Sequence, residues 1–371
     1  MRVGLVIFGS LDSLTGGYLY DRRLLEYLRS RGDQTRVVSL PLRTYPRHLA
    51  DNFSPSLARR LASARFDVLI QDELNHPSLV MLNRWLRTQA GYPIVTLVHL
   101  LRSSERRASL LRHAYAVVEG RYLETVDAAI FNCHTTRQAA EELLGRTIPG
   151  VVAYPGCDHM RAQLTDAEVT ARVRAAGPLR VVSIANVVPG KGLHNLVTAL
   201  ARLPAETWRL TVAGSLTTDR IYVRRLRYLI GRLGLDANVQ LLGSVPNQRI
   251  TEHLGRAHLL ALPSSYEALG IAYLEAMQFG LPVIATTAGG AREVVDDGRE
   301  GFFVAPGDVD ALSKYLRLLM TDRELLLRMG LAARRRAQRH PTWDQSFQCA
   351  RKLLSCLAAS HQRRRREETS L

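Results

Sequence analysis

The sequence predicts an α/β protein made of two doubly wound domains, each with a parallel sheet. A chain of 371 residues is long for a single hydrophobic core. Short apolar runs that fit buried strands alternate with segments of helical periodicity, which is the pattern of a parallel sheet covered by helices. The alternation stops in a polar, alanine-rich stretch and restarts after Gly177 and Pro178, so it occurs twice.

The first half, residues 1–160, predicts one complete domain. Its strands are short apolar runs bounded by turn residues. After the first strand comes a loop with Gly16 and Gly17, and then a helix that carries apolar residues at a spacing of four. The predicted strands of this half are Val3–Phe8, Phe66–Ile70, Pro93–Val98, Asp127–Phe131 and Val151–Tyr154.

The second half predicts a linker over residues 161–178 and a second domain over residues 179–340. Its strands are Arg180–Ile184, Trp208–Ala213, Val239–Leu242, Leu259–Leu262, Val283–Thr286 and Gly301–Val304. Within residues 341–360 we expect a terminal helix, Trp343–Ala359, and we expect the basic tail 361–371 to be disordered. Two such domains would place the carboxyl ends of their sheets across a cleft, where ligands bind.

The composition argues against several classes of protein. The chain is 46% hydrophobic and 23% charged, as in an ordinary globular protein. It has no run of eighteen apolar residues, and Met1–Gly9 resembles a strand more than a signal peptide, so we expect no membrane span. The four cysteines lack metal-ligand or paired spacing, which favours reduced thiols and a cytoplasmic protein.

The net charge of +16 indicates anionic partners. The basic residues are spread along the chain and aromatics make up only 6%, which argues against nucleic acid as the partner. Nucleotide phosphates or anionic lipid headgroups fit this charge better. The arginine-rich segment Leu100–His113 fits a solvated helix face, although peripheral contact with the inner face of the membrane stays an alternative.

Lys191 stands out because only three of the 50 basic residues are lysines. It lies in Asn186–Gly192, which follows a predicted strand and opens a predicted helix. A lysine beside backbone N–H groups at a helix start suits a diphosphate. The alternative is an exposed loop lysine, but arginine would serve a solvated loop equally well in this arginine-rich chain.

Two carboxylates, Glu267 and Glu275, lie in one strand–loop–helix unit. Glu267 belongs to the loop after a predicted strand, and the helix is expected to run from Gly270 to Gly280. Glu275 follows eight residues after Glu267, close to two helical turns, so both would lie on roughly the same face. The alternative is an acid at a helix N-terminus with a second, solvated glutamate.

The residues around this pair carry a resemblance to a known family. Glu267–Met277, Gly280–Ile284 and Gly289–Val295 closely resemble the signature of the retaining GT4 glycosyltransferases, and the match continues to Asp308. The resemblance implies the GT-B fold and a nucleotide-diphosphate sugar as donor. It also implies that the first domain binds the acceptor and that the terminal helix returns to that domain.

The resemblance further implies roles for residues of the second domain. Glu275 would hydrogen-bond the ribose of the nucleotide, and Glu267 would lie near the donor sugar and its phosphates. Lys191 would bind the diphosphate. In the family an arginine precedes this lysine by five residues. Here the position is Asn186, which would bind the donor by a hydrogen bond to the diphosphate but could not neutralise its charge. The backbone of three further residues would contact the sugar or diphosphate: Leu269, Gly270 and Ile271.

In the first domain the resemblance points to His99 and to the pair of glycines. His99 follows the strand Pro93–Val98, where the family commonly carries a histidine that contacts the transferred hexose. On its own it fits a capping or core histidine better. Gly16 and Gly17 match the loop by which the family brings its backbone close to the donor phosphate. The catalytic residues expected from these matches are Glu267, His99 and Lys191.

These observations together predict a retaining, metal-independent hexosyltransferase without a cofactor. The donor would be a UDP- or GDP-linked sugar and the acceptor a glycan, a lipid or a small molecule. The segment around Glu267 and Glu275 contains no Asp-x-Asp motif that could hold a metal with the donor. The alternatives are a GT-B phosphorylase or sugar-nucleotide epimerase, and a catalytically weak scaffold that binds nucleic acid or a membrane surface.

Overall fold

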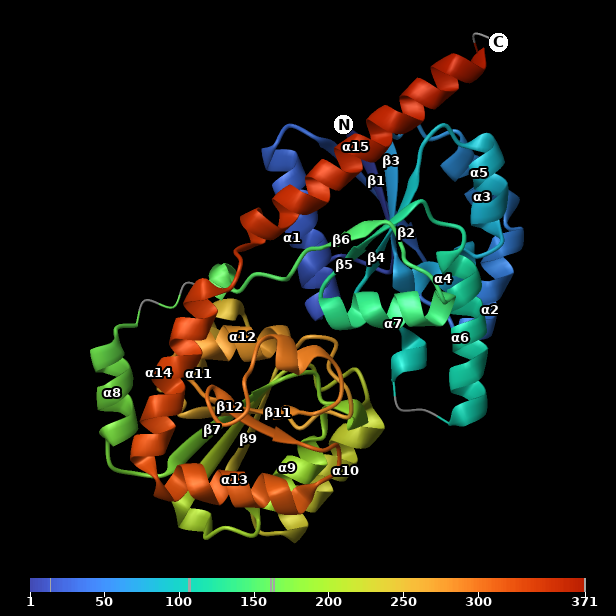
Figure 1. The fold of residues 1–371 in the computed structure, drawn as a ribbon. Coiled ribbons are helices and arrows are strands. Elements are labelled where there is room, and N and C mark those ends of the chain that lie inside the picture. The colour runs from blue at the N-terminus through green and yellow to red at the C-terminus, as the bar shows by residue number, and fades with distance from the viewer. Residues whose placement is uncertain (14, 106–107, 161, 163, 370–371) are drawn as a thin grey trace. The chain divides into compact units, whose positions relative to one another are not determined.

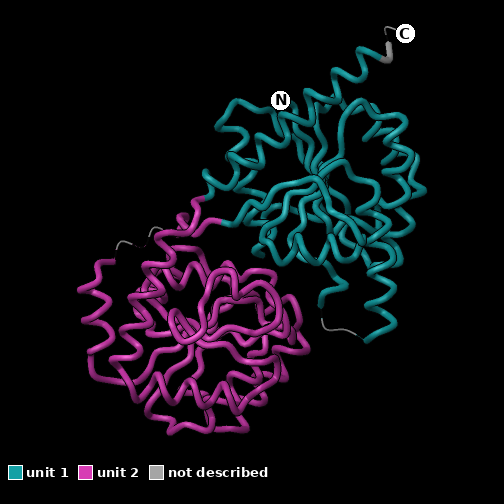
Figure 2. Tube along the Cα trace, in the orientation of Figure 1, with its two compact units in different colours: residues 1–155, 343–371 teal, residues 156–342 magenta. Residues whose placement is uncertain are grey.

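The chain forms two compact α/β units (Figure 1). The computed structural model describes residues 1–13, 15–105, 108–160, 162 and 164–369. Unit 1 comprises residues 1–155 together with 343–371, and unit 2 comprises residues 156–342 (Figure 2). The chain therefore passes from unit 1 to unit 2 and back, and the second unit is inserted into the first. The sequence placed the boundary slightly later, at residue 160.

Unit 1 contains a six-stranded parallel sheet among its described residues, in the order β2-β1-β3-β4-β5-β6. Its strands are β1 (Arg2–Phe8), β2 (Gln34–Leu40), β3 (Val68–Asp72), β4 (Ile94–Val98), β5 (Ala128–Phe131) and β6 (Gly150–Val152). The sequence analysis did not identify β2. This strand lies at the edge of the sheet and carries polar residues at exposed positions, so it lacks the apolar run that marked the others.

Two helical layers cover the sheet of unit 1. Val6 and Phe8 of β1 face one core, whereas Val3 and Leu5 face the other, because successive side chains of a strand point to opposite faces. The helices of this unit are α1 (Gly16–Ser30), α2 (Tyr45–Ala50), α3 (Pro55–Ala62), α4 (His76–Leu79), α5 (Leu82–Gln89), α6 (Ser109–Leu123), α7 (His134–Leu144) and α15 (Trp343–Thr369).

Helix α15 completes one core of unit 1 although it comes from the end of the chain. Figure 1 shows α15 beside α1. Trp343 and Phe347 are buried there, and their rings lie 5.5 Å and 5.0 Å from the ring of Tyr20 on α1. The helix does not end near Ala359, and it continues through the arginine-rich stretch to Thr369. The tail expected to be disordered from residue 361 is therefore helical as far as the structure describes it.

Unit 2 repeats the architecture with a parallel sheet in the order β12-β11-β10-β7-β8-β9. Its strands are β7 (Leu179–Ile184), β8 (Trp208–Ala213), β9 (Val239–Gly243), β10 (Leu259–Ala261), β11 (Val283–Thr286) and β12 (Gly301–Val304). Its helices are α8 (Asp166–Arg174), α9 (Leu193–Leu200), α10 (Arg220–Arg232), α11 (Asn247–Arg256), α12 (Ile271–Gln278), α13 (Val309–Thr321) and α14 (Arg323–Arg339).

The stretch expected to be a linker, residues 161–178, is largely part of unit 2. Thr165 and Glu168 form a capping box that starts α8, and Val169 and Val173 are buried in the core of this unit. None of the described helices combines the length and the apolar composition that crossing a bilayer requires.

Replacing Phe347 by alanine should destabilise unit 1, because it removes a fully buried ring between α15 and α1. We expect the free energy of unfolding, measured by urea denaturation, to fall by about 3–5 kcal/mol. The matched control is Gln348→Ala, one residue along on the exposed side of α15, which should change it by less than about 0.5 kcal/mol. Equal losses in the two variants would contradict the packing role of α15.

Candidate functional site

In unit 2, three loops meet at the carboxyl ends of the neighbouring strands β7, β10 and β11. The loop after β10 bonds to the loop after β7, since Ser265 N donates to Gly190 O at 2.8 Å. It also bonds to the loop after β11, because Glu267 N donates to Ala288 O at 3.0 Å. These backbone bonds fix the loops against one another at the edge of the sheet where open α/β proteins bind ligands.

Two glycines allow this close approach. Gly192 has φ of 66°, and a Cβ there would lie 2.1 Å from the carbonyl oxygen of Pro263. Gly289 has φ of 100°, and a Cβ there would lie 1.9 Å from the carbonyl oxygen of Glu267. Any larger residue would force the loops apart, so the glycines are needed where the backbones touch.

Lys191 and Glu267 form an ion pair in this loop cluster. The ammonium of Lys191 lies 2.6 Å from Oε1 of Glu267, which also accepts a 2.6 Å hydrogen bond from the hydroxyl of Ser264. The Glu267 side chain is 10% exposed and that of Lys191 is 31% exposed. The ammonium of Lys191 is therefore accessible to a ligand, while the hydrogen bond from Ser264 holds the carboxylate of Glu267 in place.

Helix α12 begins directly after this pair. Leu269 is buried and Gly270, with φ of 90°, turns the chain into the helix whose first residue is Ile271. The first N–H groups of a helix have no partner within the helix, and they favour anionic groups. The backbone predicted to contact the sugar or diphosphate thus forms the start of α12.

Glu275 lies on α12 and has a different partner from Glu267. Its Oε1 lies 3.0 Å from Nε2 of His159, and the pair is nearly buried. Because α12 starts at Ile271, Glu267 is outside the helix, and the two carboxylates do not share one helical face as the sequence suggested.

In unit 1, His99 follows β4 and contacts α1. Its Nε2 lies 3.0 Å from Oδ1 of the buried Asp21, and a Cβ on Gly17 would lie 3.3 Å from its ring. Gly16 and Gly17 form the first turn of α1, which lets this helix pack close to His99. Burial alone would lower the pKa of His99, but the carboxylate of Asp21, helped by Asp72 and Glu73, outweighs it and raises that pKa.

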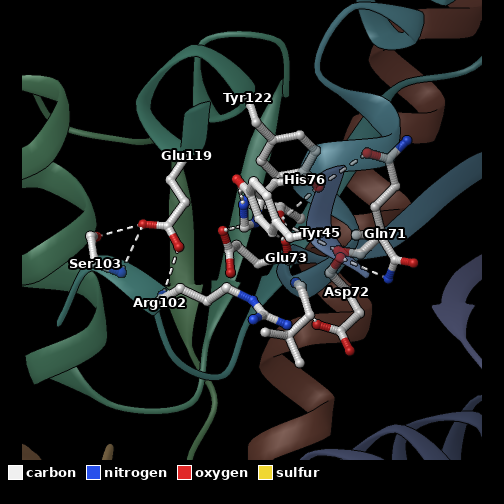
Figure 3. Close-up of polar contacts among 12 residues, drawn as sticks. Tyr45, Gln71, Asp72, Glu73, His76, Arg102, Ser103, Glu119 and Tyr122 are labelled. Atoms are coloured by element: carbon white, nitrogen blue, oxygen red, sulfur yellow. Dashed lines mark hydrogen bonds and ion pairs between the residues drawn. The ribbon is translucent and has the colours of Figure 1, made fainter. Parts of the chain in front are cut away.

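A cluster of buried polar side chains lies at the end of β3 (Figure 3). Asp72 is the last residue of this strand. Glu73 begins the short 3₁₀ helix that follows (Glu73–Asn75), and His76 begins α4. The side chain of Glu73 is fully buried, and neither carboxylate oxygen has a hydrogen-bond partner among the described residues. Nδ1 of His76 forms its hydrogen bond with the carbonyl oxygen of Glu73, at 3.0 Å. Oε1 of Glu73 lies at the same distance from Nδ1 but outside hydrogen-bonding geometry.

Other elements of unit 1 close this cluster. The carboxylate of Glu119 on α6 accepts hydrogen bonds from the backbone N–H groups of Arg102, at 2.6 Å, and Ser103, at 3.2 Å. The hydroxyl of Tyr45 lies 2.9 Å from Nε2 of His76 (Figure 3). The guanidinium of Arg102 lies over the ring of Tyr45, 5.9 Å from its centre.

Burial controls the protonation of this cluster. It raises the pKa of Glu73 to about 8, an effect that the positive charge of Arg102 partly offsets. Burial and the neighbouring Glu73 raise the pKa of Glu119 to about 7. Burial and the charge of Asp21 raise the pKa of Asp72 to about 7. Because burial also lowers the pKa of His76 to about 4, this ring is neutral.

Two sets of these groups have the composition of a divalent-cation site, with ligand atoms within 4.8 Å of one another in each set: Asp21, Asp72 and His99, and Glu73, His76 and Glu119. In the second set, Glu119 already accepts hydrogen bonds from Arg102 and Ser103. Protonation of Glu73 keeps this set close to neutral without a metal.

Comparison with known proteins identifies the family. A family model described as "Glycosyl transferases group 1" matches residues 168–336, and one described as "Glycosyl transferase 4-like domain" matches residues 14–156. The chain belongs to the GT4-like glycosyltransferases. The two matches cover most of both units, and they confirm the resemblance seen in the sequence.

Curated relatives match part of this GT4-like chain. An exopolysaccharide phosphotransferase of Streptomyces coelicolor is 33% identical over 60% of the chain and 23% of its own length. A GDP-mannose-dependent α-(1-6)-phosphatidylinositol monomannoside mannosyltransferase of Mycobacterium tuberculosis is 30% identical over 59% of both chains. The chain thus spans less than two thirds of the length of these relatives.

Solved structures confirm the GT-B fold of this GT4-like protein. Sucrose-phosphate synthase from Thermosynechococcus elongatus superposes with a TM-score of 0.81 at 20% identity, over 97% of this chain and 99% of that one. Anabaena HepE in complex with UDP and glucose gives 0.78 at 21% identity, over 96% and 100%. Identities this low support the fold alone.

Asn186 is the position where this chain departs from the GT4 pattern. Its Oδ1 accepts a hydrogen bond from Ser215 N at 3.0 Å, so the side chain joins the loop after β7 to the loop after β8. The sequence predicted that it would face the donor phosphates. The structure gives its oxygen a role within the protein, which an arginine could not fill because a guanidinium has no acceptor.

The sequence analysis missed the buried acids of unit 1 in this GT4-like chain. Asp21 lies inside a helix with an apolar pattern, and Glu119 is one acid among several on a predicted helix. Asp72, Glu73 and His76 offered a signal, because polar residues directly after a buried strand lie at the functional edge of a parallel sheet.

Replacing Glu73 by glutamine should make stability less sensitive to pH. An unfolded glutamate titrates near 4.5, whereas the folded pKa is about 8, so wild type loses stability as pH rises between these values. The free energy of unfolding of Glu73→Gln relative to wild type should therefore increase from pH 5 to pH 8, as measured by urea denaturation.

The control for this change is Glu124→Gln, which alters an exposed acid of unit 1. Its stability should follow the wild-type pH profile. A Glu73→Gln profile parallel to wild type would show that Glu73 is already ionised in the folded protein.

Proposed function

We propose that this chain is a retaining glycosyltransferase that moves a hexose from a nucleotide-diphosphate sugar to an acceptor hydroxyl. The observation that carries the proposal is the cluster of Lys191, Glu267 and the start of α12 at the carboxyl edge of the unit 2 sheet. It combines a reachable cation, a fixed carboxylate and backbone N–H groups. These are the groups that a sugar diphosphate requires.

Each group of unit 2 has a role in binding the donor. Lys191 would neutralise the diphosphate as it departs, and the N–H groups at Leu269–Ile271 would hydrogen-bond its oxygens. Glu275 would accept hydrogen bonds from the ribose hydroxyls, since an ionised carboxylate is a strong acceptor. Glu267 would hold Lys191 in position and lie near the sugar. Asn186 would shape the loop that carries Lys191.

In unit 1, His99 would contact the hexose, held by Asp21 at 3.0 Å and by the glycine turn of α1. Gly16 and Gly17 would let the backbone approach the donor. We propose that retention arises because the acceptor hydroxyl attacks the anomeric carbon on the face from which the diphosphate leaves. Its proton would pass to a phosphate oxygen, so neither glutamate would need to form a covalent bond.

The relatives support a nucleotide-sugar donor of the UDP or GDP type. One relative is named as GDP-mannose-dependent, and one solved structure holds UDP and glucose. We propose that transfer needs neither a metal nor a cofactor, because Lys191 and the start of α12 supply the positive potential at the diphosphate. The acceptor would be a glycan, a lipid or a small molecule.

We also propose that the protein acts in the cytoplasm, at the inner face of the membrane when its acceptor is a lipid. The high net charge of +16 would favour contact with anionic headgroups. Leu110 and Leu111 of α6 are exposed apolar residues in the arginine-rich segment that the sequence singled out.

Replacing Lys191 by alanine should abolish most transfer. Loss of one preorganised charge at a departing group typically costs about 10²–10³-fold in turnover. The measurement is release of UDP or GDP from a panel of nucleotide sugars, with donor hydrolysis used to find the active one. Lys314→Ala, which removes an exposed lysine of the same unit, is the control and should keep wild-type turnover. Near-normal turnover of Lys191→Ala would remove it from the diphosphate site.

Replacing His99 by alanine should reduce transfer while leaving nucleotide binding intact, because we assign it to the hexose and not to the nucleotide. Turnover is measured with the active donor, and the dissociation constant of the nucleoside diphosphate by calorimetry. Parallel losses in both quantities would instead indicate that His99 acts through the fold of unit 1.

A further inference from the structure

The segment that enters unit 2 from unit 1 is fixed against helix α12. It contains the short 3₁₀ helix η4 (Asp158–Met160), which follows directly on the crossing at Pro155 and Gly156. The thiol of Cys157 accepts a hydrogen bond from Nε2 of Gln278 at 3.1 Å. Cys157 and Met160 are both buried, so the segment is packed into unit 2 on either side of His159.

His159 makes the second polar contact between this segment and α12. Its Nε2 lies 3.0 Å from Oε1 of Glu275, with side chains 2% and 11% exposed. Within the described part of the chain, Nε2 of His159 is the only atom that forms a hydrogen bond with the Glu275 carboxylate. His159 is therefore not a solvated loop residue. Its ring is directed at Glu275, the carboxylate that we propose binds the ribose.

We propose that His159 is a positioning residue for the nucleotide, acting through Glu275. This inference rests on the proposed function, because it takes Glu275 as the ribose ligand. Nε2 of His159 donates to Oε1 and so fixes the rotamer of the glutamate. Oε2 is then presented to the ribose hydroxyls in a geometry that exists before the nucleotide arrives, which removes the cost of ordering a flexible side chain.

The proposal explains why a histidine and not an apolar residue fills this buried position. A carboxylate that is almost out of solvent needs a hydrogen-bond donor. A donor that took both oxygens would compete with ribose. A single ring N–H at 3.0 Å satisfies one oxygen and leaves the other for the ligand.

The test compares His159→Leu, His159→Gln, Glu275→Ala and the double variant His159→Leu with Glu275→Ala. The dissociation constants of UDP and GDP are measured by calorimetry, and the KM and kcat for the donor by initial rates. His159→Leu should weaken nucleotide binding about 10-fold, the size expected for one hydrogen bond to a charged group. His159→Gln should restore most of it, because the amide nitrogen of glutamine can replace Nε2.

Two readouts separate positioning from a general structural effect. The loss in His159→Leu should appear in KM with little change in kcat, since the nucleotide and not the reacting centre is affected. In the Glu275→Ala background, His159→Leu should cause almost no further loss, because the two residues act as one unit. His253→Leu, a partly exposed histidine on α11, is the control and should bind nucleotide like wild type.

The outcomes distinguish this inference from the proposed function. Unchanged nucleotide binding in Glu275→Ala would remove Glu275 as the ribose ligand and with it the role of His159, whereas the proposed transfer function is tested separately by the turnover of Lys191→Ala. Weaker binding in Glu275→Ala with no effect of His159→Leu, or additive losses in the double variant, would overturn the role of His159 alone. If His159→Leu does not fold, as judged by thermal denaturation, His159→Asn replaces it. Asparagine is too short to reach Glu275, so the same outcomes apply.

Discussion

The donor side of this protein depends on the backbone contacts between the loops after β7, β10 and β11. These loops come from strands that are neighbours in the sheet but far apart in the sequence. Gly192 and Gly289 let the backbones touch, and the hydrogen bonds of Ser265 and Glu267 hold them together. The ion pair of Lys191 with Glu267 follows from this contact. The accessible ammonium of Lys191 keeps one position because the Glu267 carboxylate that pairs with it is fixed by the loop contacts.

The fold could be predicted from the sequence because buried parallel strands appear as apolar runs between helical segments. The edge strand β2 was missed, since three of its seven residues are exposed and only two are buried. In the site, the sequence indicated Lys191, Glu267 and His99 because each follows an apolar strand, and it indicated Glu275 through the family resemblance. It could not show that His159 pairs with Glu275, since that contact joins residues 116 apart.

The buried acids of unit 1 show how a polar site can be kept inside a folded protein. Four carboxylates lie near His99 and His76, and Arg102 is a nearby cation. Burial keeps part of them protonated, so the cluster avoids the repulsion of several adjacent negative charges. This arrangement stabilises the fold less than an apolar core would. Buried groups with perturbed pKa values cluster at functional sites.

The insertion of unit 2 within unit 1 has a consequence for synthesis on the ribosome. The core between the first sheet and α1 is not complete until Trp343 and Phe347 have been made. Residues 156–342, by contrast, are continuous and can fold as soon as they emerge. The nascent chain would therefore carry a finished second unit while the first still exposes an apolar surface. Chaperone dependence during translation should then concentrate on the amino-terminal half.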